Sequence, residues 1–435
     1  MFPMKGEYFA AHRARIIEMF RKFKLERSII FLRSDNLFKE CFVDIELPFY
    51  QEALFYWLSG WKMANSAIII DVHTKKSILL VPDFDEESTY WVYPRLSFKD
   101  IKNQTHVDEV AYMKDLDIIL DKINKTSRPI HRFLGYSEDP PLEYDDTKML
   151  IDIGGLARKV KFEWEIKCLK YAAELTSEAL VYAMKHAKPG MNEKNLDIDF
   201  RYYGELHGAD KTSFLTTIAS GEHASFPHYN KNDSDMKSGK LVVMDCGFYF
   251  NHYAGDVSRT FPVNGKFNDL QKEMYNSMFM LQMYVISLIK PGVHISDLDS
   301  LALEWIFDIL KKHNIVNQNL PYNDDIAFVF APHSISHHVG CNVHDLCMFS
   351  EMNQDDTLQK DMVITIEPGI YFNKGSLEKA KNDNLPINYD KALEYCDIIG
   401  GIRIEDDLLI TDNGIQFLSN APKTIDEIES IMRQK

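Results

Sequence analysis

An internal repeat is the feature that most restricts how this chain can fold. Two long predicted helices end at identical Lys-Pro-Gly triplets, 188–190 and 290–292, which lie 102 residues apart. Apolar positions after the triplets match at the same offset, as Leu196 does with Leu298, and another amphipathic helix is predicted after each. Pro-Gly after a helix is common by chance, but the shared offset favours a duplication. It predicts a domain of two helix–helix–strand halves related by a pseudo-twofold axis.

Before the repeat, the chain has the pattern of a separate mixed unit. Its expected elements are three strands and a helical stretch: Ser28–Leu32, Ser66–Asp71, Ser77–Val81 and residues 102–126. Gly154-Gly155 marks the end of this unit. The sequence therefore predicts an α/β (α+β) protein with two domains, residues 1–157 and 158–435, in keeping with roughly 150 residues per domain.

Composition and charge exclude several classes of protein. Hydrophobic residues make up 45% of the 435 residues and charged residues 26%, which excludes a disordered or collagen-like chain. The net charge of −16 has the wrong sign for binding nucleic acid or an anionic membrane. Six cysteines without a C-x-x-C pair, and an N-terminus without an apolar signal segment, predict reduced thiols and a cytoplasmic location.

Two predicted strands of the second domain carry an aspartate each. Leu241–Cys246 contains Asp245, and Tyr253–Val263 contains Asp256. A hairpin that turns at Phe250-Asn251 would place the two carboxylates opposite each other, with Cβ atoms about 4.5–5.5 Å apart. Two opposed carboxylates destabilise a sheet unless a cation lies between them. The pair therefore favours a metal site over two alternatives, an aspartate that points to solvent and a hairpin of another register.

Two later strands carry glutamates. Glu367 ends one predicted strand, and Glu405 lies inside another that is strongly apolar. Arg403, Glu405 and Asp407 share one face of the second strand because side chains alternate with a period of two. A buried Glu405 needs a partner, which is either Arg403, in a purely structural role, or a metal ion.

A histidine cluster lies between the two acidic strand pairs. The segment APHSISHHVGCNVHD holds four histidines, and a weaker member precedes the first aspartate strand: His333, His337, His338, His344 and His228. Four carboxylates and one imidazole would balance two divalent cations per chain. Oxygen-rich ligation favours Mn²⁺, with Co²⁺ as the alternative, over a metal that prefers thiolates, and paired metals can activate one water molecule.

In chain order, the motifs MDCG, AGDVSRTFP, HSISHHVG, NVHD, ITIEPGIYF and GGIRIEDD resemble those of the pita-bread metallopeptidases. This family includes aminopeptidase P, prolidase and methionine aminopeptidase. Pro48–Trp61 and the segment TYWVYP around Trp91 resemble the N-terminal domain of prolidases. The insert between Phe372 and Gly400 is also similar to theirs. The resemblance implies a creatinase-like domain, residues 1–157, followed by a pita-bread catalytic domain, residues 158–435.

The resemblance also implies a role for each site residue. Asp245 would hold one metal, His337 and Glu367 the other, and Asp256 and Glu405 would bridge both. Glu367 would act as general acid/base while a hydroxide activated by the metals attacks the carbonyl before proline. Five further residues would bind substrate or orient ligands: His228, His333 and His344 in the pocket, Trp91 reaching across a homodimer, and Arg403 beside the bridging carboxylates.

The favoured function is an Xaa-Pro dipeptidase, or prolidase, acting on proline-containing dipeptides and other short peptides. The alternatives are an aminopeptidase P acting on longer peptides and, remotely, a metal-free pita-bread binding protein. Ser334 and Ser336 replace motif glycines, Phe214 replaces a tyrosine, and residues 346–361 lack the arginine that binds a dipeptide carboxylate. We therefore expect dipeptides to be cleaved with weak carboxylate recognition, so that X-Pro-Pro is cleaved within about tenfold of X-Pro.

Overall fold

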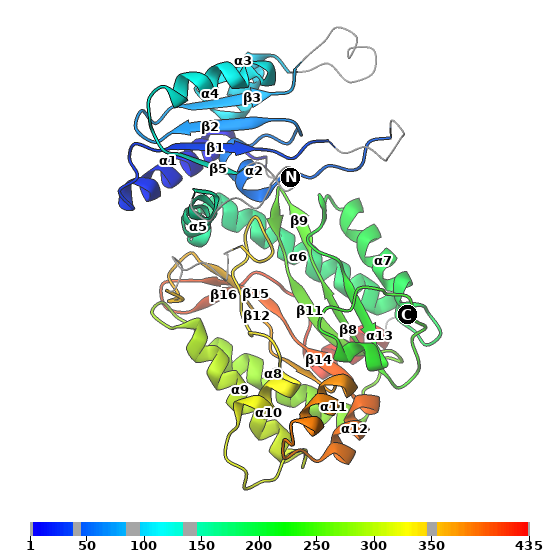
Figure 1. Ribbon diagram of the computed structural model, residues 1–435. Helices are drawn as coiled ribbons and strands as arrows, with labels where there is room; N and C mark the ends of the chain where they lie inside the picture. The colour runs from blue at the N-terminus through cyan, green and yellow to red at the C-terminus, as the bar shows by residue number, and fades with distance from the viewer. Residues whose placement is uncertain (1–2, 38–44, 84–95, 134–145, 346–354, 434–435) are drawn as a thin grey trace. The chain divides into compact units, whose positions relative to one another are not determined.

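The computed structural model describes residues 3–37, 45–83, 96–133, 146–345 and 355–433, which form two compact units (Figure 1). The first unit extends to Lys159 and the second begins at Val160. The predicted domain boundary after residue 157 lies beside this division. The predicted substrate residue Trp91 lies outside the described residues. Within the described part of the chain, no helix is long and apolar enough to cross a membrane.

The first unit contains a five-stranded mixed sheet in the order β4-β3-β2-β1-β5. Its strands are β1 (Ile29–Arg33), β2 (Ala67–Asp71), β3 (Ser77–Val81), β4 (Glu109–Tyr112) and β5 (Ile130–Phe133). Its α-helices are α1 (Gly6–Lys22), α2 (Ala53–Ser59), α3 (Phe98–Thr105), α4 (Leu116–Asn124) and α5 (Asp146–Lys159). Apolar side chains of α4 pack on the face formed by Ile29, Phe31 and Ile69. The three strands predicted in this unit are confirmed.

The stretch 102–126, predicted to be helical, is not one helix. It contains the end of α3, strand β4 and then α4, and β4 pairs parallel with β3 at the edge of the sheet. Strand β4 has only four residues, and its side chains are exposed or half-buried. So short an apolar pattern does not distinguish a strand from a helix. Strand β5, at the opposite edge, is not among the predicted strands.

The second unit has the predicted succession of helix, helix and strands, twice over. The first half contains α6 (Glu163–His186), α7 (Glu193–Leu206), β6 (Lys211–Thr212), β7 (Thr217–Ser220), β8 (Leu241–Cys246), β9 (Phe248–Phe250), β10 (Tyr253–Ala254) and β11 (Val257–Pro262). The second half contains α8 (Asp269–Leu288), α9 (Ile295–Lys312), α10 (Asp324–Phe330), β12 (Val363–Ile366), β13 (Gly369–Tyr371), α11 (Lys374–Asn382), α12 (Tyr389–Ile398), β14 (Gly401–Arg403), β15 (Asp406–Ile410) and β16 (Ile415–Phe417). Helix α13 (Ile425–Arg433) ends the described chain.

Both halves share one hydrophobic core. Helix α6 packs on β9, β10 and β11, and helix α8 packs on β12 and β14 (Figure 1). The predicted ends of these helices are confirmed, because each Lys-Pro-Gly triplet follows its helix within a few residues. The insert between Phe372 and Gly400 forms α11 and α12, whose buried side chains belong to the same core.

The first hairpin does not have the predicted register. It turns at Asn251 and His252, whose φ angles of 52° and 65° are those of a two-residue turn that matches strand twist. Asp245 therefore pairs with Ser258 rather than with Asp256. This shift by two residues leaves both aspartates on the face that the prediction gave them.

Both hairpins are interrupted where they carry an acidic residue. The interruptions lie at Gly247, at Gly255-Asp256, at Glu367-Pro368 and at Ile404-Glu405. Strand pairing keeps one register across each interruption, so Glu367 lies opposite Glu405. The N–H of Glu367 donates to the Ile335 carbonyl at 2.7 Å, and that of Glu405 donates to the Ser258 carbonyl at 3.1 Å. The side chains of Asp256, Glu367 and Glu405 therefore lie at the interruptions, whereas Asp245 lies within β8.

Gly255 is needed at the first interruption because helix α6 lies directly against it. A Cβ atom added there would lie 2.8 Å from backbone atoms of Ala172. We expect Gly255→Ala to lower the free energy of unfolding by about 1–3 kcal/mol, as overpacking does. Gly414→Ala is the control, because the nearest atom to its added Cβ is 3.9 Å away. Urea denaturation of both variants checks this, and equal stability would contradict the steric argument.

Candidate metal centre

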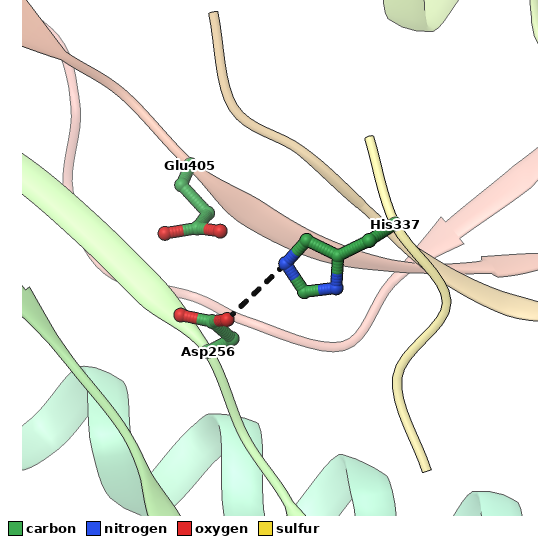
Figure 2. A group of neighbouring side chains, drawn as sticks. All are labelled: Asp256, His337 and Glu405. Carbon is green, nitrogen blue, oxygen red and sulfur yellow. Dashed lines mark ion pairs between the residues drawn. The ribbon is translucent and has the colours of Figure 1, made fainter. Parts of the chain in front are cut away.

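Three of the predicted metal ligands form one buried group. The ligand atoms of Asp256, His337 and Glu405 all lie within 4.8 Å of one another (Figure 2). Nε2 of His337 is 3.4 Å from a carboxylate oxygen of Asp256 and 3.5 Å from Oε1 of Glu367. Asp256 and Glu405 come from interrupted strands of different halves, so the group joins the two halves of the repeat.

The His337 ring is held in the orientation that a metal ligand requires. Its Nδ1 lies 3.2 Å from the His338 carbonyl, which can only accept, so Nδ1 carries the proton and Nε2 faces the carboxylates. Its backbone N–H donates to Oγ1 of Thr365 at 3.1 Å, and its carbonyl accepts from the Thr365 N–H at 2.9 Å. A carbonyl that fixes the tautomer in this way is the usual companion of a metal-binding histidine.

Asp245, the predicted ligand on β8, is bound by Arg403. The two form an ion pair in which the arginine side chain is 3% exposed. Nε of Arg403 donates to Oγ of Ser258 at 3.1 Å, and that hydroxyl donates to Glu405 at 2.6 Å. Arg403 was expected beside the bridging carboxylates. It forms an ion pair with Asp245 and is linked to Glu405 through Ser258.

The acidic groups are held in an environment that disfavours their charge. Burial raises the pKa of Asp256 and of Glu405 well above the usual range, and neighbouring carboxylates raise both further. Burial also raises the pKa of Glu367 to about 7, against the opposing effects of His337 and Arg403. A divalent cation among these groups would favour their charged forms again.

Unpaired atoms show that the residues fit a cation. Among the described residues, Oδ1 of Asp245 and Oδ1 of Asp256 are buried without a hydrogen-bond partner. Buried polar atoms are seldom unpaired, and a bound cation would provide the missing partner. Four carboxylates and one neutral imidazole suit a hard or intermediate divalent ion rather than one that prefers thiolates.

The predicted pocket histidines lie around this group. The ring of His344 stands edge-on to that of His337, with centroids 4.3 Å apart. Burial, and then the charge of His337, lower the pKa of His344 to about 4. His228 is exposed, and its charge lowers the pKa of both His333 and His344. His338, to which no role is assigned, pairs with Ile364 in an isolated β-bridge.

His333 differs from the other pocket histidines because both of its ring nitrogens are already bonded. Nδ1 lies 2.8 Å from the Ser334 carbonyl, and Nε2 lies 2.8 Å from the Tyr371 hydroxyl. Tyr371 in turn accepts from Nη1 of Arg403 at 2.6 Å. Burial, and then Arg403, lower the pKa of His333 to about 4. The ring is therefore neutral and fixed, and it accepts the Tyr371 proton at Nε2.

Two supporting acids were not assigned a role from the sequence. Asp299, on α9, accepts from the Ser334 hydroxyl and the Ile335 N–H at 2.9 and 2.8 Å, which accommodates the serine that replaces a motif glycine. Asp407 accepts from the Asp256 N–H at 2.9 Å. The shared face of Arg403, Glu405 and Asp407 was a signal for the second contact, but no sequence pattern indicated the first.

Comparisons with known proteins agree on one family. The model of metallopeptidase family M24 matches residues 167–412, and that of the aminopeptidase P N-terminal domain matches residues 9–131. A probable Xaa-Pro aminopeptidase of Ajellomyces capsulatus (strain H143) is 32% identical over 425 residues, which cover 90% of this chain and 82% of the relative. Another, of Sordaria macrospora, is 31% identical and covers 99% and 97%. The structure of aminopeptidase P from E. coli in its low-pH form has a TM-score of 0.81, 25% identity and complete coverage of both chains.

The duplicated fold and its buried carboxylate–imidazole group are those of a metallopeptidase. The chain belongs to metallopeptidase family M24. The predicted fold class is confirmed: an N-terminal domain of the aminopeptidase P type precedes a pita-bread catalytic domain. Family membership implies divalent metal ions, so the expectation of a metal-free binding protein has no support.

Metal binding should displace protons from the metal-free protein. Glu367, with a pKa of about 7 in the metal-free protein, is partly protonated near neutral pH, and burial also raises the pKa of Asp256 and of Glu405. Bound metal requires ionised carboxylates. We expect about one or more protons to be released per chain. Calorimetric titration of chelator-treated protein with Mn²⁺, in two buffers of different ionisation enthalpy, measures this number. Identical heats in both buffers would contradict it.

Asp407 and Asp256 should respond differently to the same substitution. Burial raises the pKa of Asp407 to about 8, so the neutral amide of an asparagine would mimic its protonated form and still accept from the Asp256 N–H. We expect Asp407→Asn to retain most peptidase activity, whereas Asp256→Asn and Glu405→Gln lose nearly all of it. Asp407→Leu removes the acceptor and should cost about 1–3 kcal/mol of stability. Equal losses of activity in all three amide variants would refute the assignment.

Proposed function

We propose that this metallopeptidase is an Xaa-Pro aminopeptidase, which removes the N-terminal residue from peptides whose second residue is proline. Support comes from the curated relatives named above, which match nearly the whole chain and are Xaa-Pro aminopeptidases by name. The aminopeptidase P alternative is therefore better supported than the prolidase function favoured from the sequence. The relatives and structures named above do not specifically support the prolidase function.

The engagement of Arg403 is the structural observation that carries this choice. A dipeptidase must bind the carboxylate that directly follows proline, and burying that charge without a cationic partner is costly. The guanidinium of Arg403 already donates to Asp245, Ser258, Tyr371 and the Pro227 carbonyl. The sequence has no arginine at 346–361 to take its place. A longer peptide avoids the problem, because an amide follows its proline.

The described side chains also account for the remaining chemistry. Metal ions held by Asp245, Asp256, His337, Glu367 and Glu405 would lower the pKa of water and polarise the scissile carbonyl. Glu367 would take a proton from the attacking water and return it to the proline nitrogen. The rings of His344 and His228 would donate hydrogen bonds to the substrate carbonyl oxygen. His333 would act through Tyr371 and Arg403.

Three further expectations complete the proposal. The oxygen-rich ligand set favours Mn²⁺ as the metal. The buried free thiols of Cys246 and Cys396 are compatible with a reducing, cytoplasmic location. A homodimer in which Trp91 reaches the partner's site stays a prediction from the family resemblance.

Peptide length tests the proposal. With Mn²⁺ present, we expect kcat/KM for Gly-Pro-Pro to exceed that for Gly-Pro by about tenfold or more, or about 1.4 kcal/mol. Gly-Pro-amide is the matched control, because it lacks only the carboxylate and should be cleaved better than Gly-Pro. Glu367→Gln, which should lose about 10²–10⁴-fold in rate, controls for contaminating peptidases. If Gly-Pro is cleaved faster than both Gly-Pro-Pro and Gly-Pro-amide, the protein is a dipeptidase instead.

A further inference from the structure

Gln282, on helix α8, is fully buried beside the interruption of the second hairpin. Its Nε2 donates to the carbonyls of Ile366 and Ile404, both at 3.1 Å. Each of these residues directly precedes a predicted metal ligand, Glu367 or Glu405. We infer that Gln282 is a positioning residue. By holding the backbone next to both glutamates, it would fix the orientation of their carboxylates toward the metal ions.

The hairpin needs this outside donor because of Pro368. The register that holds on both sides of the interruption places Pro368 opposite Ile404, whose N–H donates to the Pro368 carbonyl at 3.5 Å. The return bond of such a pair cannot form, because proline has no N–H. The carbonyl of Ile404 would be left buried and unpaired, and Gln282 provides its donor.

The orientation of the Gln282 amide is itself fixed. Lys423, which can only donate, lies 3.4 Å from Oε1 of Gln282, and Oδ2 of Asp406, 3.0 Å from Nε2, shares the two amide hydrogens with the two carbonyls. Asp406 is held in turn by a buried ion pair with Arg259 at 2.7 Å. These contacts point Nε2 toward the two carbonyls, so the strand interruption rests on a rigid network rather than on an adaptable side chain.

This inference concerns the metal ligands alone and does not depend on the length of the peptide substrate. Its test is calorimetric titration of chelator-treated protein with Mn²⁺, together with urea denaturation. Gln282→Met keeps the side-chain length and removes the donors. Gln271→Met is the matched control, because Gln271 lies on the same helix, is equally buried, and also donates Nε2 to two carbonyls, those of Gly239 and Ile398.

We expect both variants to lose stability, but only Gln282→Met to bind Mn²⁺ about 10–100-fold more weakly, as loss of a ligand-supporting group does. Gln271→Met should stay within about twofold of wild type, because its partners lie outside the site. If Gln282→Met does not fold, Gln282→Asn replaces it, since the shorter amide cannot reach both carbonyls. Unchanged Mn²⁺ affinity in a folded Gln282 variant, or equal losses at both positions, would overturn the inference.

Discussion

Repulsion among buried carboxylates is the constraint on which the catalytic unit depends. Asp256, Glu405 and Glu367 all lie within a few ångströms of His337, where an uncompensated charge costs several kcal/mol. Two buried arginines in the described part of the chain lie beside these groups, but Arg403 is paired with Asp245 and Arg259 with Asp406. In the metal-free protein the buried carboxylates therefore lack enough positive charge to balance them, and divalent metal ions would supply it. Folding has already placed the carboxylates close together, so metal binding relieves their unfavourable burial and gains affinity from it.

The backbone N–H groups of the two glutamates connect distant parts of the catalytic unit. Glu367 and Glu405 face each other at a non-hydrogen-bonded position of their hairpin, so the N–H of Glu405 points outward and reaches Ser258 on the other half. The N–H of Glu367 likewise reaches Ile335, inside the segment that carries His333 and His337. Each glutamate thus positions its carboxylate and ties a second element to the centre with the same residue. The residues of the site therefore also help to hold the two halves of the unit together.

Much of this arrangement could be predicted from the sequence, and the failures have physical causes. Helices that end at Lys-Pro-Gly and acidic residues inside apolar strands are local patterns. The repeat and the candidate metal ligands could therefore be predicted from the sequence. The hairpin register could not, because it depends on positive φ angles at Asn251 and His252. Strand β4 is too short to carry a clear period. The supports given by Asp299 and Gln282 join residues far apart in the chain, and no local pattern records such contacts.

The two halves of the repeat have also come to stabilise equivalent interruptions by unlike means. In the first half, Gly255 lets helix α6 approach until backbone touches backbone. In the second, an amide from α8 spans the gap by hydrogen bonding. The first half therefore has little tolerance for added volume at Gly255, and the second has little tolerance for loss of the Gln282 donor. Because the two halves tolerate different substitutions, their side chains can diverge in evolution while their backbones keep the symmetry of the duplication.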